Sequence, residues 1–256
     1  MVLQLLEPNW PAPKQVVAFS TRRSGGVSQP PYDSLNLGDH VGDDDIAVRS
    51  NRDLLYKKMA PARIDWLQQV HGNAVVSLPA AGNSKPIADG AYTSIPNIAC
   101  AVMTADCLPI LLCDERGSWV AAIHAGWRSL VAGIVENTVS AYGGRRQDLM
   151  AWQGPAIGPC HFEVGPEVRA SFLAASWAQT HPEGVRSAFN DSDRPEHYLA
   201  DLYALSRIAL VEAGISANYG GGYCTYCDKK DFYSYRRDGE TGRMATGVFL
   251  RTDTFS

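Results

Sequence analysis

The pattern of hydrophobic and polar positions along the chain predicts a mixture of strands and helices. Short apolar runs that are bounded by turn residues occupy 16–21, 98–104, 108–113 and 118–123. Runs of this length are typical of buried strands. The stretch 44–60 instead repeats its apolar positions at helical spacing and stops before Pro61, so we expect an amphipathic helix there.

Weaker patterns complete the expected order of elements. Residues 64–70 and 73–78 suggest a strand or hairpin pair around His71 and Gly72, and 129–142 suggests a helix closed by Gly143 and Gly144. We also expect strands at 149–152, 230–236 and 244–251, and helices at 164–178 and 198–213. The order shows no regular βαβ alternation. It therefore favours an α/β protein of the α+β type, with layers rather than a doubly wound sheet, and a single domain over residues 1–256.

Composition and charge act mainly by excluding classes of partner. The chain has 256 residues, a formal net charge of −4 and 45% hydrophobic residues. It offers no basic field for a nucleic acid, no apolar run near the ~20 residues that span a bilayer, and no signal-peptide pattern at its start. We therefore expect a cytoplasmic protein with reduced thiols that binds neither nucleic acid nor membrane, although a few local arginines could still bind a small anionic ligand. For the oligomeric state, which composition does not determine, the expectation is a monomer or weak homodimer.

Three segments place a soft metal ligand at the end of a strand or just after it. They are QVHG at 69–72, TADCLP at 104–109 and HAGWR at 124–128. Because ligands at strand ends can converge in space although they are distant in sequence, His71, Cys107 and His124 could form one metal site. Two imidazoles and one thiolate suit zinc, and a catalytic zinc keeps its fourth position open. The alternatives are a satisfied buried histidine and a packed cysteine, or a non-enzymatic module whose structural zinc is completed by Cys160 or His161.

Other polar residues near these motifs have more than one interpretation. Asp89 and Asp106 could orient a ligand imidazole, act as catalytic groups beside Cys107, or simply cap turns. Cys224 and Cys227 form a C-x-x-C, which can indicate a redox pair or half of a structural zinc site. No second C-x-x-C is present to complete a four-cysteine site, so we expect both residues to be packed thiols.

Several motifs in this order resemble the YfiH family, whose members carry the names polyphenol oxidase or laccase-domain protein, purine nucleoside phosphorylase and peptidoglycan editing factor. They are QVHG at 69–72, ADG at 88–90, TADCLPI at 104–110, HAGWRS at 124–129 and GPAIGPC at 154–160, together with STRRSGGVS at 20–28, SLNLG at 34–38 and FYSYRRD at 232–238. The resemblance covers nearly the whole chain, and Ser129 departs from it where glycine is frequent. It implies a layered mixed-sheet sandwich with flanking helices, related to the cytotoxic necrotizing factor catalytic domain, and zinc at His71, Cys107 and His124.

The resemblance also implies phosphorolysis of adenosine, inosine, guanosine and methylthioadenosine, and hydrolytic deamination of adenosine. Phosphorolysis needs an anion site, which a guanidinium group can provide by binding phosphate bidentately. The residues that we expect to bind phosphate or substrate are Arg22, Asn36, Arg128, Cys160, Glu163 and Arg236. The aromatic residues that could stack on a purine are Tyr32, Phe232 and Tyr235, although core packing is the default for such residues.

Other activities remain open. Cys107 and His124 could form the nucleophile and base of a cysteine hydrolase that removes misincorporated L-serine from a peptidoglycan precursor. The H-x-E motif of the cytidine-deaminase type is absent beside the ligands, so deamination would need another proton carrier, such as Asp89, Asp106 or Glu163. A copper-dependent polyphenol oxidase, or laccase, typically needs H-x-H pairs. The chain has six histidines and no such pair, although copper could still bind a site suited to zinc.

Overall fold

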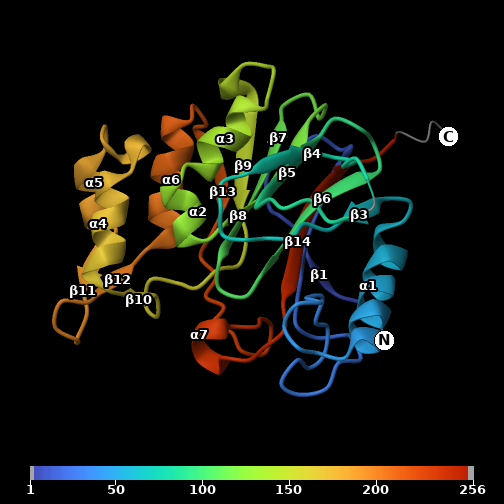
Figure 1. Cartoon of the computed structure of the whole chain (residues 1–256). Helices are drawn as coiled ribbons and strands as arrows, with labels where there is room; N and C mark the ends of the chain where they lie inside the picture. The colour runs from blue at the N-terminus through green and yellow to red at the C-terminus, as the bar shows by residue number, and fades with distance from the viewer. Residues whose placement is uncertain (1–2, 83, 253–256) are drawn as a thin grey trace.

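Two mixed β-sheets lie at the centre of the molecule (Figure 1). The computed structural model describes residues 3–82 and 84–252, so the ends of the expected domain 1–256 lie outside the described residues. One sheet has the strand order β1-β2-β14-β6-β3, and the other has the order β13-β9-β7-β8-β5-β4. The five-stranded sheet consists of β1 (Leu5–Leu6), β2 (Val16–Thr21), β3 (Arg63–Asp65), β6 (Ile98–Thr104) and β14 (Met244–Leu250). The six-stranded sheet consists of β4 (Val75–Ser77), β5 (Gly90–Thr93), β7 (Leu108–Asp114), β8 (Val120–Ala125), β9 (Leu149–Gln153) and β13 (Ala217–Gly220).

Helices cover the outer faces of both sheets (Figure 1). The helix α1 (Asp45–Met59) packs on the five-stranded sheet, and its N-terminus is capped by the side chain of Asp44. The six-stranded sheet is covered by α2 (Trp127–Val131), α3 (Ile134–Ser140) and α6 (Leu202–Glu212), and α4 (Pro166–Ala174) and α5 (Pro182–Ser187) lie beyond α2 and α6, on the side away from the sheet (Figure 1). Beside these helices lies a small antiparallel sheet of β10 (Glu163–Val164), β12 (Tyr198–Ala200) and β11 (Phe189–Asp191). The remaining elements are α7 (Tyr235–Asp238) and two 3₁₀ turns, Arg146–Asp148 and Ser176–Ala178.

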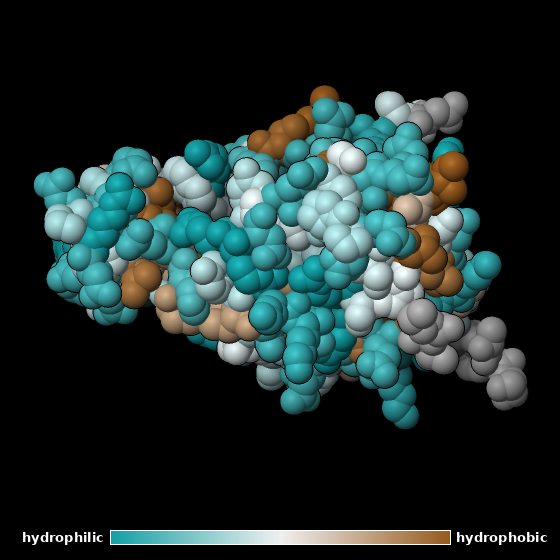
Figure 2. Space-filling view, turned by 90° about the horizontal axis from the view of Figure 1, so that it is seen from below, coloured by the Kyte–Doolittle hydropathy of each residue, from teal (hydrophilic) through white to brown (hydrophobic). Residues whose placement is uncertain are grey.

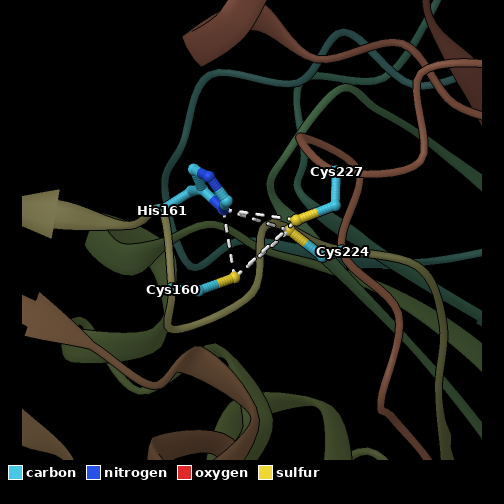
Figure 3. A group of neighbouring side chains, drawn as sticks. All are labelled: Cys160, His161, Cys224 and Cys227. Atoms are coloured by element: carbon cyan, nitrogen blue, oxygen red, sulfur yellow. Dashed lines mark hydrogen bonds between the residues drawn. The ribbon is translucent and has the colours of Figure 1, made fainter.

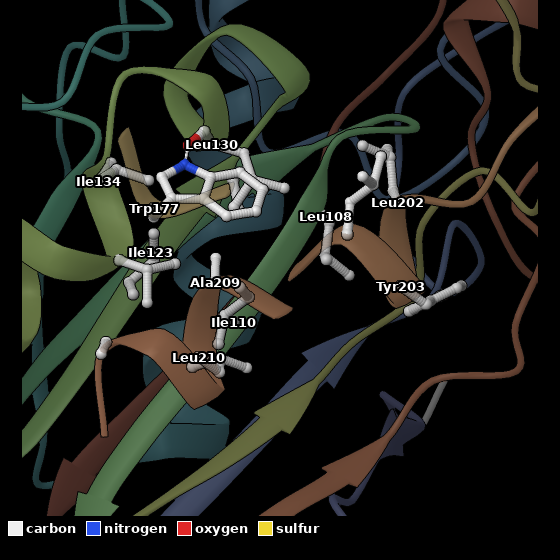
Figure 4. Close-up of a cluster of buried hydrophobic side chains, with 14 of the residues drawn as sticks. Leu108, Ile110, Ile123, Leu130, Ile134, Trp177, Leu202, Tyr203, Ala209 and Leu210 are labelled. Carbon is white, nitrogen blue, oxygen red and sulfur yellow. Dashed lines mark hydrogen bonds between the residues drawn. The ribbon is translucent and has the colours of Figure 1, made fainter. Parts of the chain in front are cut away.

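The side chains of the central strands alternate between two hydrophobic clusters. Leu108, Ile110 and Leu112 of β7 point toward the helices, where they meet α6 and Trp177 (Figure 4). Leu111 and Cys113 point the other way and pack between the two sheets. This period of two follows from strand geometry, and burial on both faces explains why the strand is continuously apolar. The two sheets and the helices packed directly on them therefore form four layers, in the order helices, sheet, sheet and helix, and α4 and α5 lie outside the helices that cover the six-stranded sheet.

The observed layers confirm the predicted fold class and most of the predicted elements. The strand expected at 16–21 and the strand expected at 98–104 have the predicted bounds, and the helix predicted over 44–60 is α1. The helix predicted over 129–142 is divided into α2 and α3, because Gly133 between them adopts a left-handed φ of 82°. A left-handed residue cannot continue a right-handed helix, so the chain changes direction there.

Three local predictions were wrong. The segments around His71 do not pair as a hairpin, because β3 joins the five-stranded sheet whereas β4 pairs with β5 in the other. The strand expected at 230–236 is absent from the described residues there, which form turns and the start of α7. The segment 198–213 begins as the strand β12 before α6 starts at Leu202. In each of these segments the sequence pattern alone did not determine the secondary structure. Whether a strand forms depends on a partner strand, and that partner is distant in the sequence.

The surface seen from the α7 side is mainly hydrophilic, with small and separate hydrophobic groups (Figure 2). Within the described part of the chain, no helix combines the length and apolar character that crossing a membrane would require.

Candidate metal centre

Strand pairing in the six-stranded sheet brings distant ligand residues to one edge. Antiparallel pairing of β7 with β8 sets Pro109 opposite His124, so Cys107, just before β7, lies beside the end of β8. His71 reaches the same place from the loop between β3 and β4. One ligand atom from each of His71, Cys107 and His124 lies within 4.8 Å of the others, and the Cys107 Sγ is 3.8 Å from the His71 Nε2. The structure thus assembles a group that could hold a metal ion.

The loop that carries His71 is held by side chains rather than by regular structure. The side chain of Gln69 makes two hydrogen bonds with the backbone of Met103. Its Nε2 donates to the Met103 carbonyl at 2.9 Å, and its Oε1 accepts from the Met103 N–H at 2.7 Å. His71 itself has a left-handed φ of 58°. A non-glycine residue in this conformation costs free energy and commonly marks a functional site.

Asp89 is the buried anchor of the centre. Its carboxylate accepts hydrogen bonds from the backbone N–H groups of His71 at 2.9 Å and Gly72 at 2.7 Å, and it contacts the Nδ1 of His124 at 2.8 Å. Burial raises the pKa of Asp89, but the hydrogen bonds from His124 and Gly72 outweigh burial and hold that pKa below its usual range. Because Nδ1 of His124 is occupied by Asp89, Nε2 is the nitrogen left for a metal.

Cys107 and His124 favour each other's charged form. Burial raises the pKa of the Cys107 thiol, but the charges and hydrogen bonds of His124 and His71 together lower it to about 6. Burial lowers the pKa of His124, whereas Cys107 and Asp89 raise it to about 9. The side chain at position 107 is therefore a thiolate at neutral pH, which is the form that binds metal or attacks an electrophile.

Two further residues shape the space around Cys107. Gly126 precedes α2, and a Cβ on it would lie 3.1 Å from the Cys107 Sγ and 3.2 Å from the Cδ2 of His71. Asp106 has a φ of 90°, and its carboxylate accepts hydrogen bonds from the Thr225 hydroxyl and the Arg236 backbone N–H, both at 2.6 Å. The carboxylate of Asp106 therefore connects the β6–β7 loop to two segments near the C-terminus.

A cavity of about 370 Å³ opens at the metal-ligand group. Its walls are formed by His40, Gln69, His71, Met103, Thr104, Ala105, Cys107, His124, Tyr235 and Arg243. Tyr235 is 61% exposed, and the guanidinium carbon of Arg243 lies 5.9 Å from the centre of its ring. Sequence reasoning missed Arg243 and His40, because an isolated arginine before a strand and a histidine in a polar loop carry no distinguishing pattern.

The three arginines expected to bind phosphate lie outside the walls of this cavity. Arg22 forms an ion pair with Asp231. Arg128 is exposed on α2, with its guanidinium 4.3 Å from the Trp127 ring. The Arg236 side chain donates to the backbone carbonyl of Glu163 at 2.8 Å, and the Glu163 side chain does not line the cavity.

Other predicted substrate ligands are buried within the fold. Asn36 is fully buried. Its amide nitrogen donates to Gly38 and Asp43, and its oxygen accepts from the backbone N–H groups of Gly38 and Arg243. All of its hydrogen-bonding capacity is thus used within the protein, and it supports the loop beside Arg243. Tyr32 and Phe232 are also buried, which leaves Tyr235 as the aromatic residue of the three that faces the cavity.

A second group of ligand atoms comes from Cys160, His161, Cys224 and Cys227, and none of these residues joins the first group. The prediction that Cys224 and Cys227 are packed thiols was wrong, because Cys224 is only half-buried and Cys227 is exposed. Cys160, which was expected to contact substrate, is exposed beside them. Sequence spacing could not reveal this group, since 64 residues separate Cys160 from Cys224.

Comparisons with known proteins agree over almost the whole chain. Residues 17–251 match the family model described as multi-copper polyphenol oxidoreductase laccase. A purine nucleoside phosphorylase of Pseudomonas aeruginosa is 51% identical over 96% of this chain and 98% of its own length. The purine nucleoside phosphorylase YfiH of Escherichia coli is 46% identical over 96% of this chain and 99% of its own length.

Solved structures show the same relationship. A Neisseria meningitidis protein assigned to DUF152 matches with a TM-score of 0.90 and 44% identity, over 96% of this chain and 99% of that one. The Bacillus licheniformis protein YfiH matches with a TM-score of 0.85 and 30% identity, over 93% of each chain. Together with the shared motifs, these similarities confirm that the chain belongs to the YfiH family, whose named members indicate an enzyme.

Proposed function

We propose that this protein is a zinc-dependent purine nucleoside phosphorylase that acts on adenosine, inosine, guanosine and methylthioadenosine. The observation that carries the proposal is a single cavity, about 370 Å³ in volume, lined both by the three metal-ligand residues and by Arg243. Its volume suits a small-molecule site. The names of the P. aeruginosa and E. coli relatives support this class of reaction.

The donor set of His71, Cys107 and His124 fits zinc. Three nitrogen and sulfur ligands from the protein are the number found in catalytic zinc sites, where a fourth position is left for water or substrate. When bound, the ion supplies a Lewis acid that polarises a coordinated oxygen and lowers the pKa of bound water. Asp89 fixes the imidazole of His124 from behind, as carboxylates commonly do for ligand histidines.

Arg243 is the residue of the cavity best suited to hold phosphate. Among the ion pairs formed by the described residues, none involves Arg243. One terminal nitrogen donates to the carbonyls of Thr241 and Gly242, which fixes the direction of the side chain. Burial lowers the pKa of Arg243, while the negative charges of Cys107 and Asp106 oppose this effect. A half-buried guanidinium without a carboxylate partner favours binding of an anion such as phosphate.

Tyr235 provides an aromatic face for the purine. Its ring is largely exposed and lies at the cavity beside Arg243. In phosphorolysis a phosphate oxygen forms a bond to the ribose C1′ as the bond from C1′ to the purine nitrogen breaks, and the departing purine takes up a proton. Stacking on Tyr235 would hold the base while Arg243 holds the phosphate. Deamination of adenosine is a second reaction that we assign to the same cavity, with water in place of phosphate as the nucleophile.

The proposal is tested by measuring metal content and nucleoside turnover in parallel. Wild-type protein purified without added metal should contain zinc and release hypoxanthine from inosine only when phosphate is present. Cys107→Ala should lose both its ion at this site and its turnover. Arg243→Gln should raise the KM for phosphate far more than the KM for inosine, whereas Arg186→Gln, on an exposed helix away from the cavity, should change neither. Zinc without phosphate-dependent turnover would contradict the proposal.

A cysteine hydrolase that edits a peptidoglycan precursor is the second candidate. The observation in its favour is that the pKa of Cys107 is lowered to about 6 beside His124, which resembles an activated nucleophile and its base. Metal occupancy separates the two functions, because a thiolate bound to zinc is a weaker nucleophile than a free one. Metal-free protein that is active on an amide of the precursor and inactive on inosine would favour the hydrolase. Copper in place of zinc, with oxidation of a phenol, would instead support the polyphenol oxidase activity in the family's description.

A further inference from the structure

Three cysteines and a histidine from two distant segments meet at the surface (Figure 3). Cys160 and His161 lie in the loop between β9 and β10, and Cys224 and Cys227 lie in the segment between β13 and α7. In Figure 3 the three sulfurs and the imidazole point toward one common centre. The proposed phosphorylase reaction does not use these four residues. They form a group separate from His71, Cys107 and His124.

The spacing of the ligand atoms matches a tetrahedral zinc site. With zinc–sulfur bonds of about 2.3 Å and zinc–nitrogen bonds of about 2.0 Å, a tetrahedron places two sulfurs about 3.8 Å apart and a sulfur and a nitrogen about 3.5 Å apart. The Cys160 Sγ lies 3.9 Å from that of Cys224 and 3.8 Å from that of Cys227. The Nδ1 of His161 lies 3.0, 3.3 and 3.9 Å from the sulfurs of Cys160, Cys227 and Cys224. The two sulfur–sulfur distances agree with the tetrahedral value, and the three sulfur–nitrogen distances lie on both sides of theirs.

The surroundings of the group also suit bound thiolates. The backbone N–H of Gly158 points at the Cys224 Sγ from 3.3 Å, as an N–H donor to a metal-bound sulfur does. The His161 ring stacks on Tyr226 with ring centres 4.1 Å apart, which fixes the direction of its nitrogen. Four protein ligands leave no open position, and closed Cys₃His sites are typical of structural rather than catalytic zinc.

We propose that Cys160, His161, Cys224 and Cys227 bind a second, structural zinc ion that fastens the β9–β10 loop to the segment after β13. This connection continues to the candidate metal centre, because Thr225 lies between two of the ligands and donates its hydroxyl hydrogen to Asp106 at 2.6 Å. Arg236 donates to the carbonyls of His161 and Glu163 and, through its backbone N–H, to Asp106. The second zinc therefore holds the segments that position the loop before Cys107.

The test is zinc analysis of protein purified without added metal, in wild type and in variants of each group. Wild type should contain about two zinc ions per chain. The double variant Cys160→Ser/Cys227→Ser and the single variant Cys107→Ala should each contain about one, because each disrupts one of the two zinc sites. Cys160 and Cys227 are exposed, so the double substitution creates no core cavity. His161→Gln should also lose one ion, whereas the matched control His197→Gln, whose Nδ1 contacts the backbone carbonyl of Pro195 at 2.9 Å, should keep both.

The outcomes for the two sites are distinguishable. If Cys160→Ser/Cys227→Ser retains the zinc content of wild type, the second site is refuted, whatever Cys107→Ala shows. If the double variant loses the zinc that wild type contains and Cys107→Ala keeps it, the result supports the second zinc site and contradicts the proposed catalytic zinc.

Thiol counting provides an independent readout. Protein prepared without reductant, then stripped of metal and denatured, should show all six cysteines as free thiols. Before stripping, zinc should protect the exposed Cys160 and Cys227 from alkylation. A disulfide between any two of the three clustered cysteines in freshly purified protein, or equal alkylation with and without the metal, would overturn the proposal.

Discussion

Individual side chains hold the ligands of the candidate metal centre in place, and Asp89 is the clearest case. One fully buried carboxylate holds the backbone of the His71 loop and the ring of His124 at the same time. It therefore couples two ligands that come from different parts of the chain. Its hydrogen bonds within the protein indicate a positioning role, and none of them requires contact with a substrate.

Asp89→Asn should weaken metal binding by about 10- to 100-fold, the range found when a partner of a ligand histidine is removed. The amide would present an N–H₂ group to backbone donors that need an acceptor, and it would lose the charge that favours His124 in its present orientation. Competition with a chromophoric chelator measures the change. Asp114→Asn is the matched control, because Asp114 is also buried and accepts backbone N–H groups, from Ser118 and Trp119. An equal loss of affinity in both variants would show a general effect of destabilisation.

The Cys107 thiol should react at unusually low pH when metal is removed. Its pKa is lowered to about 6, so alkylation of the metal-free protein should rise through pH 6 rather than through the higher range of an ordinary thiol. Mass mapping of iodoacetamide-labelled peptides distinguishes it from the other cysteines. His124→Gln should move the midpoint upward, because the cationic partner of the thiolate is gone. A midpoint that His124→Gln leaves unchanged would show that His124 does not stabilise the thiolate.

At the scale of elements, the close approach of α2 to the β6–β7 loop sets the dimensions of the centre. The N-terminus of this short helix begins at Gly126, next to the sulfur of Cys107 and the ring of His71. A side chain at position 126 would require both groups to move by a few tenths of an ångström. The helix is therefore packed against the centre through a glycine rather than through a hydrophobic contact.

Gly126→Ala should displace two ligands and reduce metal affinity, at an overpacking cost of about 1–3 kcal/mol. The added Cβ would lie 3.1 Å from the Cys107 Sγ, and neither this sulfur nor the His71 ring can withdraw without leaving the group. Metal titration followed by calorimetry measures the loss. Gly143→Ala is the control, since a Cβ there meets nothing within 4 Å, and it should bind metal as wild type does. Wild-type metal affinity in Gly126→Ala would contradict the prediction, because it would show that the β6–β7 loop can move to accommodate the added Cβ.

At the scale of the whole molecule, the two sheets act as a frame that holds residues from distant segments together. The cluster between the sheets contains Val102 and Val248 from one sheet and Leu111 and Val120 from the other. The chain crosses from the first sheet to the second at residues 105–107, so Cys107 lies at the crossover. Packing between the sheets therefore determines where the thiolate stands relative to the histidines.

Leu111→Ala should lower the free energy of unfolding by about 2–5 kcal/mol, because it leaves a cavity between two rigid sheets that cannot collapse around it. Chemical denaturation measures this change. Val211→Ala, at a position that is 50% exposed on α6, should stay within about 0.5 kcal/mol of wild type. Equal stability of the two variants would contradict the assignment of Leu111 to a closely packed interface between the sheets.

The sequence by itself determined the central elements and the first group of ligands. The apolar runs at 98–104 and 108–113 are continuous because both faces of those strands are covered, and that local pattern is visible without a structure. His71, Cys107 and His124 could be named because each stands at a strand end or in a short loop with a recognisable motif. The layered fold also followed, from the mixture of elements and from the family resemblance.

The tertiary structure decided everything that depends on contacts between distant segments. Short strands such as β3 and β4 are assigned to different sheets by partners far along the chain, so their local pattern could not exclude a hairpin. Arg243 reaches the cavity, and Arg22, Arg128 and Arg236 do not, because the direction of an arginine side chain depends on how the helix or loop that carries it packs in the fold, and its neighbours in sequence do not show this. Cys160 and His161 meet Cys224 and Cys227 for the same reason: two loops, each anchored by its own strand, end side by side only after the sheets have formed.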